Sequence, residues 1–271
     1  MARPLWFVAL IKKTFPNVKL IAKMTKIPII GRLFDKLLFE GDDIIYLTQD
    51  KLIPINQSIE RQDDLVLPSQ VLEYFINKAN YHFIMNTCIC RESMDCQDYP
   101  KDLGCLFMGE GTLDINPQLG RKVSKEEALE HSKKCREAGL VHLIGRNKLD
   151  QQWLGVGDGK KLLTVCNCDP CCCLWRITPV LTPRISSKVT KLAGVKVKVT
   201  EKCIGCGTCT KNICFVDAIH LVENRASINE NCKGCGRCVS DCPQNAIELT
   251  FEDEEYVKKA IKRIDKLVDI T

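Results

Sequence analysis

Apolar residues recur at helical spacing in two long stretches of the chain. In the first, Ser69 after Pro68 is a candidate N-cap, and the apolar positions that follow are Val71, Leu72, Phe75, Ile76 and Ala79. In the second, the apolar face consists of Val257, Ala260, Ile261, Ile264, Leu267 and Val268. Each pattern predicts an amphipathic helix with one packed face. We expect the second helix to dock on the upstream part of this chain or on a partner.

Capping residues at both ends, and not a periodic apolar pattern, indicate a further helix. Ser124 and Glu127 form a capping-box pair, and Gly139 follows the helical stretch. Short apolar runs at residues 81–85 and 141–144 predict strands before and after this helix.

Two pairs of apolar runs predict β-hairpins. The first pair lies within residues 43–57, where the runs 44–47 and 52–55 flank a polar turn. The second pair, residues 153–156 and 162–165, flanks an Asp158-Gly159 turn. The glycines between residues 155 and 159 also suggest a phosphate-binding loop. Such a loop leads into a helix, however, and the residues that follow are strand-like, so we expect a hairpin.

Residues 1–42 form a basic amphipathic arm. We expect short helices there, interrupted at Pro16 and at Pro28 with Gly31. Residues 1–40 contain eight lysines and arginines but only Asp35 and Glu40 as acids. Helical amphipathicity usually reports packing, so we favour an arm that packs on this protein's own core or on a partner subunit. The alternative is an interfacial helix on an anionic membrane surface.

The amino-acid composition limits the cellular compartment and the partners that we expect for the protein. The chain has 271 residues, a formal net charge of +5 and 18 cysteines. It shows no secretory signal and no apolar run long enough to span a membrane. Abundant cysteine without export favours metal binding in a reducing cytoplasm over disulfides. The basic residues are not interleaved with aromatic stacking residues, so we expect no nucleic-acid partner.

Eight cysteines between residues 203 and 242 carry the strongest chemical signal. Three cysteines at intervals of two residues are followed closely by a fourth, and the pattern then repeats. The two copies are Cys203, Cys206, Cys209 and Cys214, and then Cys232, Cys235, Cys238 and Cys242. Intervening glycines let the backbone curl so that three sulfurs point into one small volume. Thiolates so placed suit an iron–sulfur centre or, less often, zinc.

These residues resemble bacterial-type ferredoxins with two [4Fe–4S] clusters, in which the fourth cysteine of each run binds the other cluster. The resemblance implies one cluster on Cys203, Cys206, Cys209 and Cys242, and a second on Cys232, Cys235, Cys238 and Cys214. Flanking residues repeat as well, since 199–202 match 228–231 and 217–219 match 245–247. We therefore expect two related halves.

The first copy departs from the second at one point. Four residues, rather than three, separate Cys209 from Cys214, and Phe215 stands where the second copy has Pro243. Cys214 is therefore the ligand that the spacing supports least.

Ten further cysteines lie upstream, and most of them gather after two strand-like runs. These are Cys88 and Cys90, and then Cys166, Cys168, Cys171, Cys172 and Cys173. We expect them to supply a further centre, preferably iron–sulfur, with Cys96 and Cys105 as additional candidates. The alternatives are zinc, a non-cubane iron–sulfur centre or a redox-active thiol pair. Neighbouring side chains on extended backbone point to opposite sides, so one or two of the three adjacent cysteines serve this centre, and the rest pack or serve a second one.

Other polar residues give weaker signals. Cys135 lies within the capped helix and is expected to be a buried free thiol. His142 lies in an apolar strand, where a hydrogen-bonded core histidine is the commoner outcome than a ligand. The sequence shows no serine–histidine–acid triad, no paired-carboxylate site and no phosphate loop with its lysine.

Together these patterns predict an α+β protein. Its parts are the arm, an α+β cysteine-rich domain at 43–195, a 2[4Fe–4S] ferredoxin domain at 196–251 and a C-terminal helix at 252–271. The cysteine-rich domain resembles modules fused to ferredoxin domains in strict anaerobes. We expect a cytoplasmic protein, with peripheral membrane contact through residues 1–40 as the open alternative.

The predicted function is low-potential electron transfer to or from a partner oxidoreductase in anaerobic metabolism. Two alternatives remain open at this point. One is a ferredoxin-dependent reductase with its reactive centre in the cysteine-rich domain. The other is an electron-delivering assembly or activation factor for another metalloenzyme.

Overall fold

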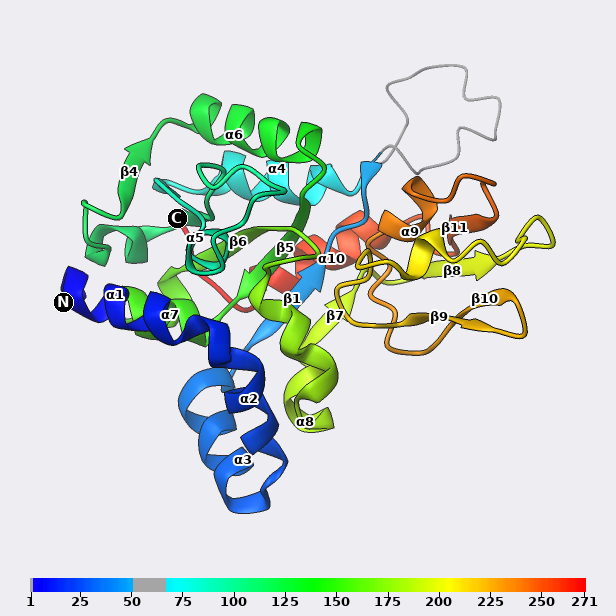
Figure 1. Cartoon of the computed structure of the whole chain (residues 1–271). Helices are drawn as coiled ribbons and strands as arrows, with labels where there is room; N and C mark the ends of the chain where they lie inside the picture. Colours follow the sequence, from blue (N-terminus) through cyan, green and yellow to red (C-terminus); the bar gives the residue numbers. More distant parts are fainter. Residues whose placement is uncertain (1, 51–66) are drawn as a thin grey trace, which may run out of the picture.

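The computed structural model describes residues 2–50 and 67–271, and its helices and sheets confirm the α+β class (Figure 1). The helices are α1 (Leu5–Thr14), α2 (Val18–Lys23), α3 (Pro28–Phe34), α4 (Ser69–Lys78), α5 (Ile89–Ser93), α6 (Lys125–Glu137), α7 (Lys148–Leu154), α8 (Pro183–Ser186), α9 (Arg237–Ser240) and α10 (Tyr256–Asp265). In this part of the chain, no helix combines the length and the apolar character needed to cross a membrane.

The central sheet has the strand order β4-β2-β3-β6-β5-β1-β7. Its strands are β1 (Asp43–Tyr46), β2 (His82–Met85), β3 (Leu106–Met108), β4 (Gly120–Val123), β5 (Val141–Arg146), β6 (Leu163–Cys168) and β7 (Val189–Lys191). Neighbouring strands are antiparallel, except that β1 and β7 run parallel.

Side chains alternate between the two faces of this sheet, as strand geometry requires. In β6, Leu163 and Val165 join one apolar core, whereas Cys166 and Cys168 lie with the core on the opposite face. The alternation of a single strand therefore sends two of the predicted ligands to the same face.

Three helices cover the face that carries Leu163 and Val165. The core there contains the apolar stripes of α4 and α10, together with Ala128 of α6. The predicted capping box of α6 is present, since the Glu127 amide donates to Ser124 Oγ at 3.2 Å and Glu127 Oε2 accepts from the Ser124 amide at 3.1 Å. The predicted docking of the last helix on the upstream part of the chain is confirmed.

The N-terminal helices lie against the opposite face, which we call the arm face. Val8 of α1 joins a core with Phe83 and Phe107, and Ala22 of α2 joins the core around Tyr46. Figure 1 shows α2 and α3 as a lobe that projects from the body of the protein. Packing of the arm on this protein's own core is therefore confirmed for one side of the arm.

The repeated cysteine segment forms two small antiparallel ladders. One pairs β8 (Val195–Val199) with β11 (Ile247–Phe251), and the other pairs β9 (Ile219–Val222) with β10 (Arg225–Ile228). The strands β8 and β11 also contribute Val195 and Leu249 to the core beneath α4 and α10.

The predicted hairpin at 153–165 is wrong. Asn147 caps a helix, because its Oδ1 accepts from the Leu149 amide at 3.1 Å, and this helix, α7, runs to Leu154. Gly155 ends α7 in the left-handed conformation, with φ +80°. Only the second run becomes a strand, β6, and it pairs with β3 and β5.

Two smaller expectations also change. Helix α4 begins at Ser69 itself rather than after it, and the Ser69 amide donates to the Asp50 carboxylate at 2.9 Å. The first half of the predicted hairpin at 43–57 is β1, which pairs with β5 and β7, whereas residues 52–55 lie outside the described residues.

Candidate metal centres

The structure brings the first predicted set of ferredoxin-type ligands together. Cys203, Cys206, Cys209 and Cys242 line one hollow. The backbone amide of Ala226 donates to Cys203 Sγ at 3.4 Å. Backbone N–H donors of this kind stabilise the negative charge of a thiolate and of a cluster that it binds. The four thiols and this hydrogen bond from a backbone amide therefore fit an iron–sulfur cluster.

The second set lines a neighbouring hollow formed by Cys214, Cys232, Cys235 and Cys238. Cys214 is equivalent to its counterpart in the repeat, because Ala218 N donates to Cys214 Sγ at 3.2 Å and Ala246 N donates to Cys242 Sγ at 3.3 Å. The extra residue before Cys214 is absorbed by a 3₁₀ turn followed by Asn212 in the left-handed region, with φ +56°. Its longer loop therefore does not displace Cys214 from the set.

The glycines between these cysteines adopt the expected conformation. Gly205, Gly207, Gly234 and Gly236 all have positive φ values, between 63° and 88°. At Gly205, an added Cβ would lie 2.0 Å from the carbonyl oxygen of Asn224. Both the turn and the close approach of the two chain segments therefore require glycine.

Solvent reaches the two sets unequally. Cys206 is exposed, and its pKa is lowered by hydrogen bonds from the Thr208 amide and hydroxyl. Burial raises the pKa of Cys235 to about 12. The first set thus reaches the surface at Cys206, whereas Cys214, Cys232 and Cys235 of the second set pack against the core of the upstream domain.

Six upstream cysteines form a group that we call the cavity cysteines. They are Cys88, Cys90, Cys105, Cys166, Cys168 and Cys173. The pairing of β3 with β6 places Cys105 beside the β6 thiols, and α5 with its preceding residue supplies Cys88 and Cys90. A hydrogen bond from Cys90 lowers the pKa of Cys88 below its usual value, which favours the thiolate form that binds metals.

A cavity of about 420 Å³ separates these cysteines from the arm. Its opposite wall is mainly apolar and includes Phe7, Phe15 and Ala22. Thiols gathered around an apolar space suit a soft metal centre, and the volume leaves room for more than a single ion.

Three of the four remaining upstream cysteines form a separate group, which we call the turn cysteines. They are Cys96, Cys171 and Cys172, and the Asp169 carboxylate lies beside them. Cys96 Sγ lies 3.4 Å from Cys171 Sγ, which in turn lies 2.8 Å from Cys172 Sγ. The sequence predicts that one or two of the three adjacent cysteines serve the further centre and that the rest pack or serve a second one. The structure places Cys173 with the cavity cysteines, and Cys171 and Cys172 in this separate group.

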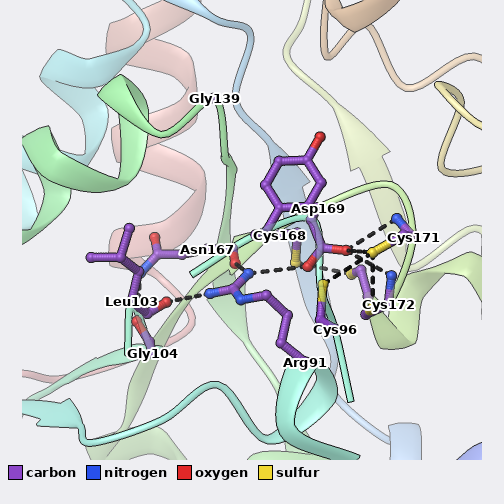
Figure 2. Close-up of polar contacts among 12 residues, drawn as sticks. Arg91, Cys96, Leu103, Gly104, Gly139, Asn167, Cys168, Asp169, Cys171 and Cys172 are labelled. Carbon is purple, nitrogen blue, oxygen red and sulfur yellow. Dashed lines mark hydrogen bonds and ion pairs between the residues drawn. The ribbon is translucent and has the colours of Figure 1, made fainter. Parts of the chain in front are cut away.

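A buried arginine lies between the two upstream groups. Figure 2 shows Arg91 reaching from α5 to Asp169, with the turn cysteines beyond the carboxylate. Its guanidinium donates to the carbonyl oxygens of Asn167 and Leu103 and to Asp169 Oδ2. Burial disfavours the charge on Arg91, but neighbouring Cys88 and Asp169 raise its pKa overall, so it stays a cation.

The ferredoxin-type and cavity cysteines meet at Tyr46 of β1. This side chain is fully buried, in a core that also contains Cys168, Cys173 and Phe215. The rings of Tyr46 and Phe215 contact edge to face, with centroids 5.6 Å apart. Just after β1, Thr48 Oγ1 donates to the Gly234 carbonyl at 2.8 Å. Phe215, the departure from the repeat, therefore joins the second set to the upstream domain.

Two expectations about single residues hold. Cys135 is buried, and burial raises its pKa to about 12, as expected for a free thiol. His142 is a hydrogen-bonded core residue, with Nδ1 2.7 Å from Asn167 Oδ1, and burial lowers its pKa to about 4. Sequence reasoning missed Tyr46, Arg91 and Asp169, because only the fold brings them to the cysteines.

Comparison with known proteins gives one match. A model of the family described as the LdpA Fe-S cluster-binding domain matches residues 210–252. This segment holds Cys214, Cys232, Cys235, Cys238 and Cys242. No curated protein and no solved structure matched the chain. With the clustered cysteines, the match shows an iron–sulfur protein whose cluster-binding domain is similar to that of LdpA.

Proposed function

We propose that the chain is an electron-transfer protein in which two ferredoxin-type [4Fe–4S] clusters are joined to a further iron–sulfur centre on the cavity cysteines. The supporting observation is that both cysteine groups share one buried core around Tyr46 and Phe215. Iron–sulfur clusters, when bound, take up and release single electrons. The protein's part is to hold the ligands close together and to keep water away from the space between them.

The proposed route runs from the surface to the interior. Cys206 is exposed and the neighbouring Ile204 is 66% exposed, so this end offers a contact for a redox partner protein. At the other end, the cavity cysteines face a mainly apolar wall. Low exposure to solvent favours a low potential, since burial penalises the extra negative charge of a reduced cluster.

Iron and acid-labile sulfide per chain test this proposal on anaerobically purified protein. We expect about twelve irons per chain, and about eight in a Cys166→Ser variant that keeps the spectroscopic signature of the ferredoxin-type clusters. A Cys135→Ala variant is the matched control, because Cys135 is buried but belongs to neither group. About eight irons in the wild type, with the cavity cysteines titrating as free thiols, would refute the further centre.

A second candidate function is favoured by the cavity. A reductase would bind an apolar substrate in this space, next to the cavity cysteines and fed by the ferredoxin-type clusters. Substrate binding would then perturb the spectrum of the cavity centre and leave the ferredoxin-type signals unchanged. If apolar probe compounds leave both sets of signals unchanged, electron transfer alone is the better account.

We propose an anionic membrane surface as a further contact, through the lobe formed by residues 18–39. The lobe exposes large apolar side chains, namely Leu20, Met24, Ile27, Ile29, Leu33 and Leu37. It also exposes basic side chains, namely Lys19, Lys23, Lys26, Arg32 and Lys36, whereas Asp35 is buried. Apolar surface combined with uncompensated positive charge complements an anionic lipid headgroup layer.

A further inference from the structure

The turn cysteines and Asp169 form a compact four-donor arrangement. One ligand atom from each of Cys96, Asp169, Cys171 and Cys172 lies within 4.8 Å of the others. Among the described residues, this is the one group of three or more such side chains that is so compact. The ferredoxin-type sets do not meet that limit, as expected for thiolates that each bind a different iron of a cluster.

The separations suit a single ion. A tetrahedral zinc with Zn–S bonds of about 2.3 Å and a Zn–O bond of about 2.0–2.2 Å holds its donors roughly 3.5–3.8 Å apart. Cys96 Sγ and Cys171 Sγ are 3.4 Å apart, and Asp169 Oδ1 lies 3.0 Å from Cys171 Sγ. Small side-chain movements therefore bring all four donors to tetrahedral distances, whereas a cluster would require the group to expand.

Local backbone explains how adjacent cysteines share one site. Cys171 and Cys172 lie in a turn that follows β6, not on extended strand, so their side chains are not forced to opposite sides. Asp169 Oδ1 accepts from the amides of both residues, at 3.0 Å from Cys171 and 2.6 Å from Cys172. The same carboxylate thus shapes the turn and faces the thiols.

A disulfide is a poor alternative at the adjacent pair. Neighbouring Cα atoms across a trans peptide lie about 3.8 Å apart, shorter than the usual disulfide range of about 4.4–6.8 Å. The peptide bonds of the described residues are all trans. The two thiols, 2.8 Å apart, would have to separate by about 1 Å to bind one tetrahedral zinc, which rotation of their side chains in the turn allows.

The surroundings match a bound cation. Cys96 and Cys172 are buried, at 6% and 8% exposure, and the Asp169 side chain is 1% exposed. Three thiolates and a carboxylate around Zn²⁺ carry two net negative charges, and the buried Arg91 cation, 3.0 Å from Asp169 Oδ2, offsets one of them. Metal-bound carboxylates are commonly oriented by such an outer partner.

From these contacts, we infer that Cys96, Asp169, Cys171 and Cys172 form a mononuclear zinc site, separate from the cavity cysteines. With four protein ligands the site is closed, which is the mark of a structural zinc. It fixes the segment around Cys96 to the turn after β6, and so holds Cys168 and Cys173 in position on either side of that turn. The inference is independent of the proposed electron transfer, because zinc carries no redox chemistry.

Metal analysis of the full chain tests the inference. We expect about one zinc per chain beside the iron, and a Cys172→Ser variant that loses this zinc while it keeps its iron and its iron–sulfur spectrum. An Asp169→Asn variant should bind zinc more weakly, at least tenfold by chelator competition, while Cys135→Ala should retain wild-type affinity. In protein grown with cobalt in place of zinc, thiolate-to-cobalt absorption bands should appear and should vanish in the Cys172 variant.

Three results would overturn the assignment. The first is a loss of about four irons from the Cys172 variant, which would make the turn cysteines cluster ligands. The second is a zinc content that no substitution at these positions changes. The third is a disulfide between Cys96 and Cys171 in freshly isolated anaerobic protein, found by mass spectrometry.

Discussion

Replacing Tyr46 by phenylalanine removes one oxygen atom from the core shared by the ferredoxin-type and cavity cysteines. The Tyr46 ring is fully buried, and no described protein atom pairs with its hydroxyl. Burial raises the pKa of Tyr46, as do the nearby thiols of Cys173, Cys168, Cys235 and Cys214, so the group remains a proton donor. Buried hydroxyls are nearly always hydrogen-bonded. We therefore expect the hydroxyl to donate to a sulfur atom once the centres are bound.

The size of the effect follows from the strength of that bond. A hydrogen bond to sulfur that is about 1 kcal/mol stronger in the reduced state raises a one-electron potential by roughly 40 mV, since about 59 mV corresponds to 1.4 kcal/mol. Tyr46→Phe should therefore lower the potential of one centre by some tens of millivolts. The ring itself is retained, so its contact with Phe215 and the fold should persist.

Potentiometric titration monitored by electron paramagnetic resonance measures this shift directly. Tyr81→Phe is a suitable control, because Tyr81 is 42% exposed and lies outside the shared core. Unchanged potentials in Tyr46→Phe, together with a higher thermal midpoint, would show that the hydroxyl is an unsatisfied group. Its removal would then stabilise the protein by about 1–3 kcal/mol, and the reasoning that links Tyr46 to the clusters would fail.

Three further changes test the packing, the buried charge and the lobe. Phe215→Ala should destabilise the protein by about 3–5 kcal/mol, measured as a lower thermal midpoint under anaerobic conditions, and an unchanged midpoint would contradict the proposed coupling at Tyr46. Arg91→Met leaves the Asp169 carboxylate buried without its cation and should also cost about 3–5 kcal/mol in the same assay, whereas a loss below about 1 kcal/mol would mean that this charge is solvated. Ile29→Glu should reduce sedimentation with phosphatidylglycerol vesicles, while Leu113→Glu, at an exposed site between β3 and β4, should not; equal sedimentation of both variants would show that the lobe does not contact the membrane.

Local signals in the sequence were sufficient for several elements. The capping box of α6 and the apolar stripe of α10 each depend on residues within a few turns of one helix, and both were predicted. Helix α7 was not, because its N-cap Asn147 lies directly after a strand and its apolar residues are few. The glycines that follow are typical of a hairpin turn, but Gly155 ends helix α7 instead.

Local sequence patterns likewise predict some of the candidate metal centres and not others. Close spacing alone brings together the three cysteines of each ferredoxin-type run, and the resemblance supplies the fourth. The upstream groups depend on tertiary contacts instead, since Cys96 and Cys171 are 75 positions apart and meet through α5 and the turn after β6. No local pattern separates Cys171 and Cys172 from Cys173, because the backbone turn decides which way each side chain points.

The ferredoxin-type segment leaves the central core at Val195 and returns to it at Leu249, just before α10 packs against α4. Both of its ends are therefore anchored in the same body, unlike a carrier domain on a flexible tether. Attachment at both ends restricts rotation of the ferredoxin-type segment relative to the central core, because any rotation would have to disrupt the packing at both ends. In the proposed electron transfer, a redox partner would come to the exposed Cys206 end, and the encounter rate would depend on diffusion of the whole protein rather than on the reach of a linker.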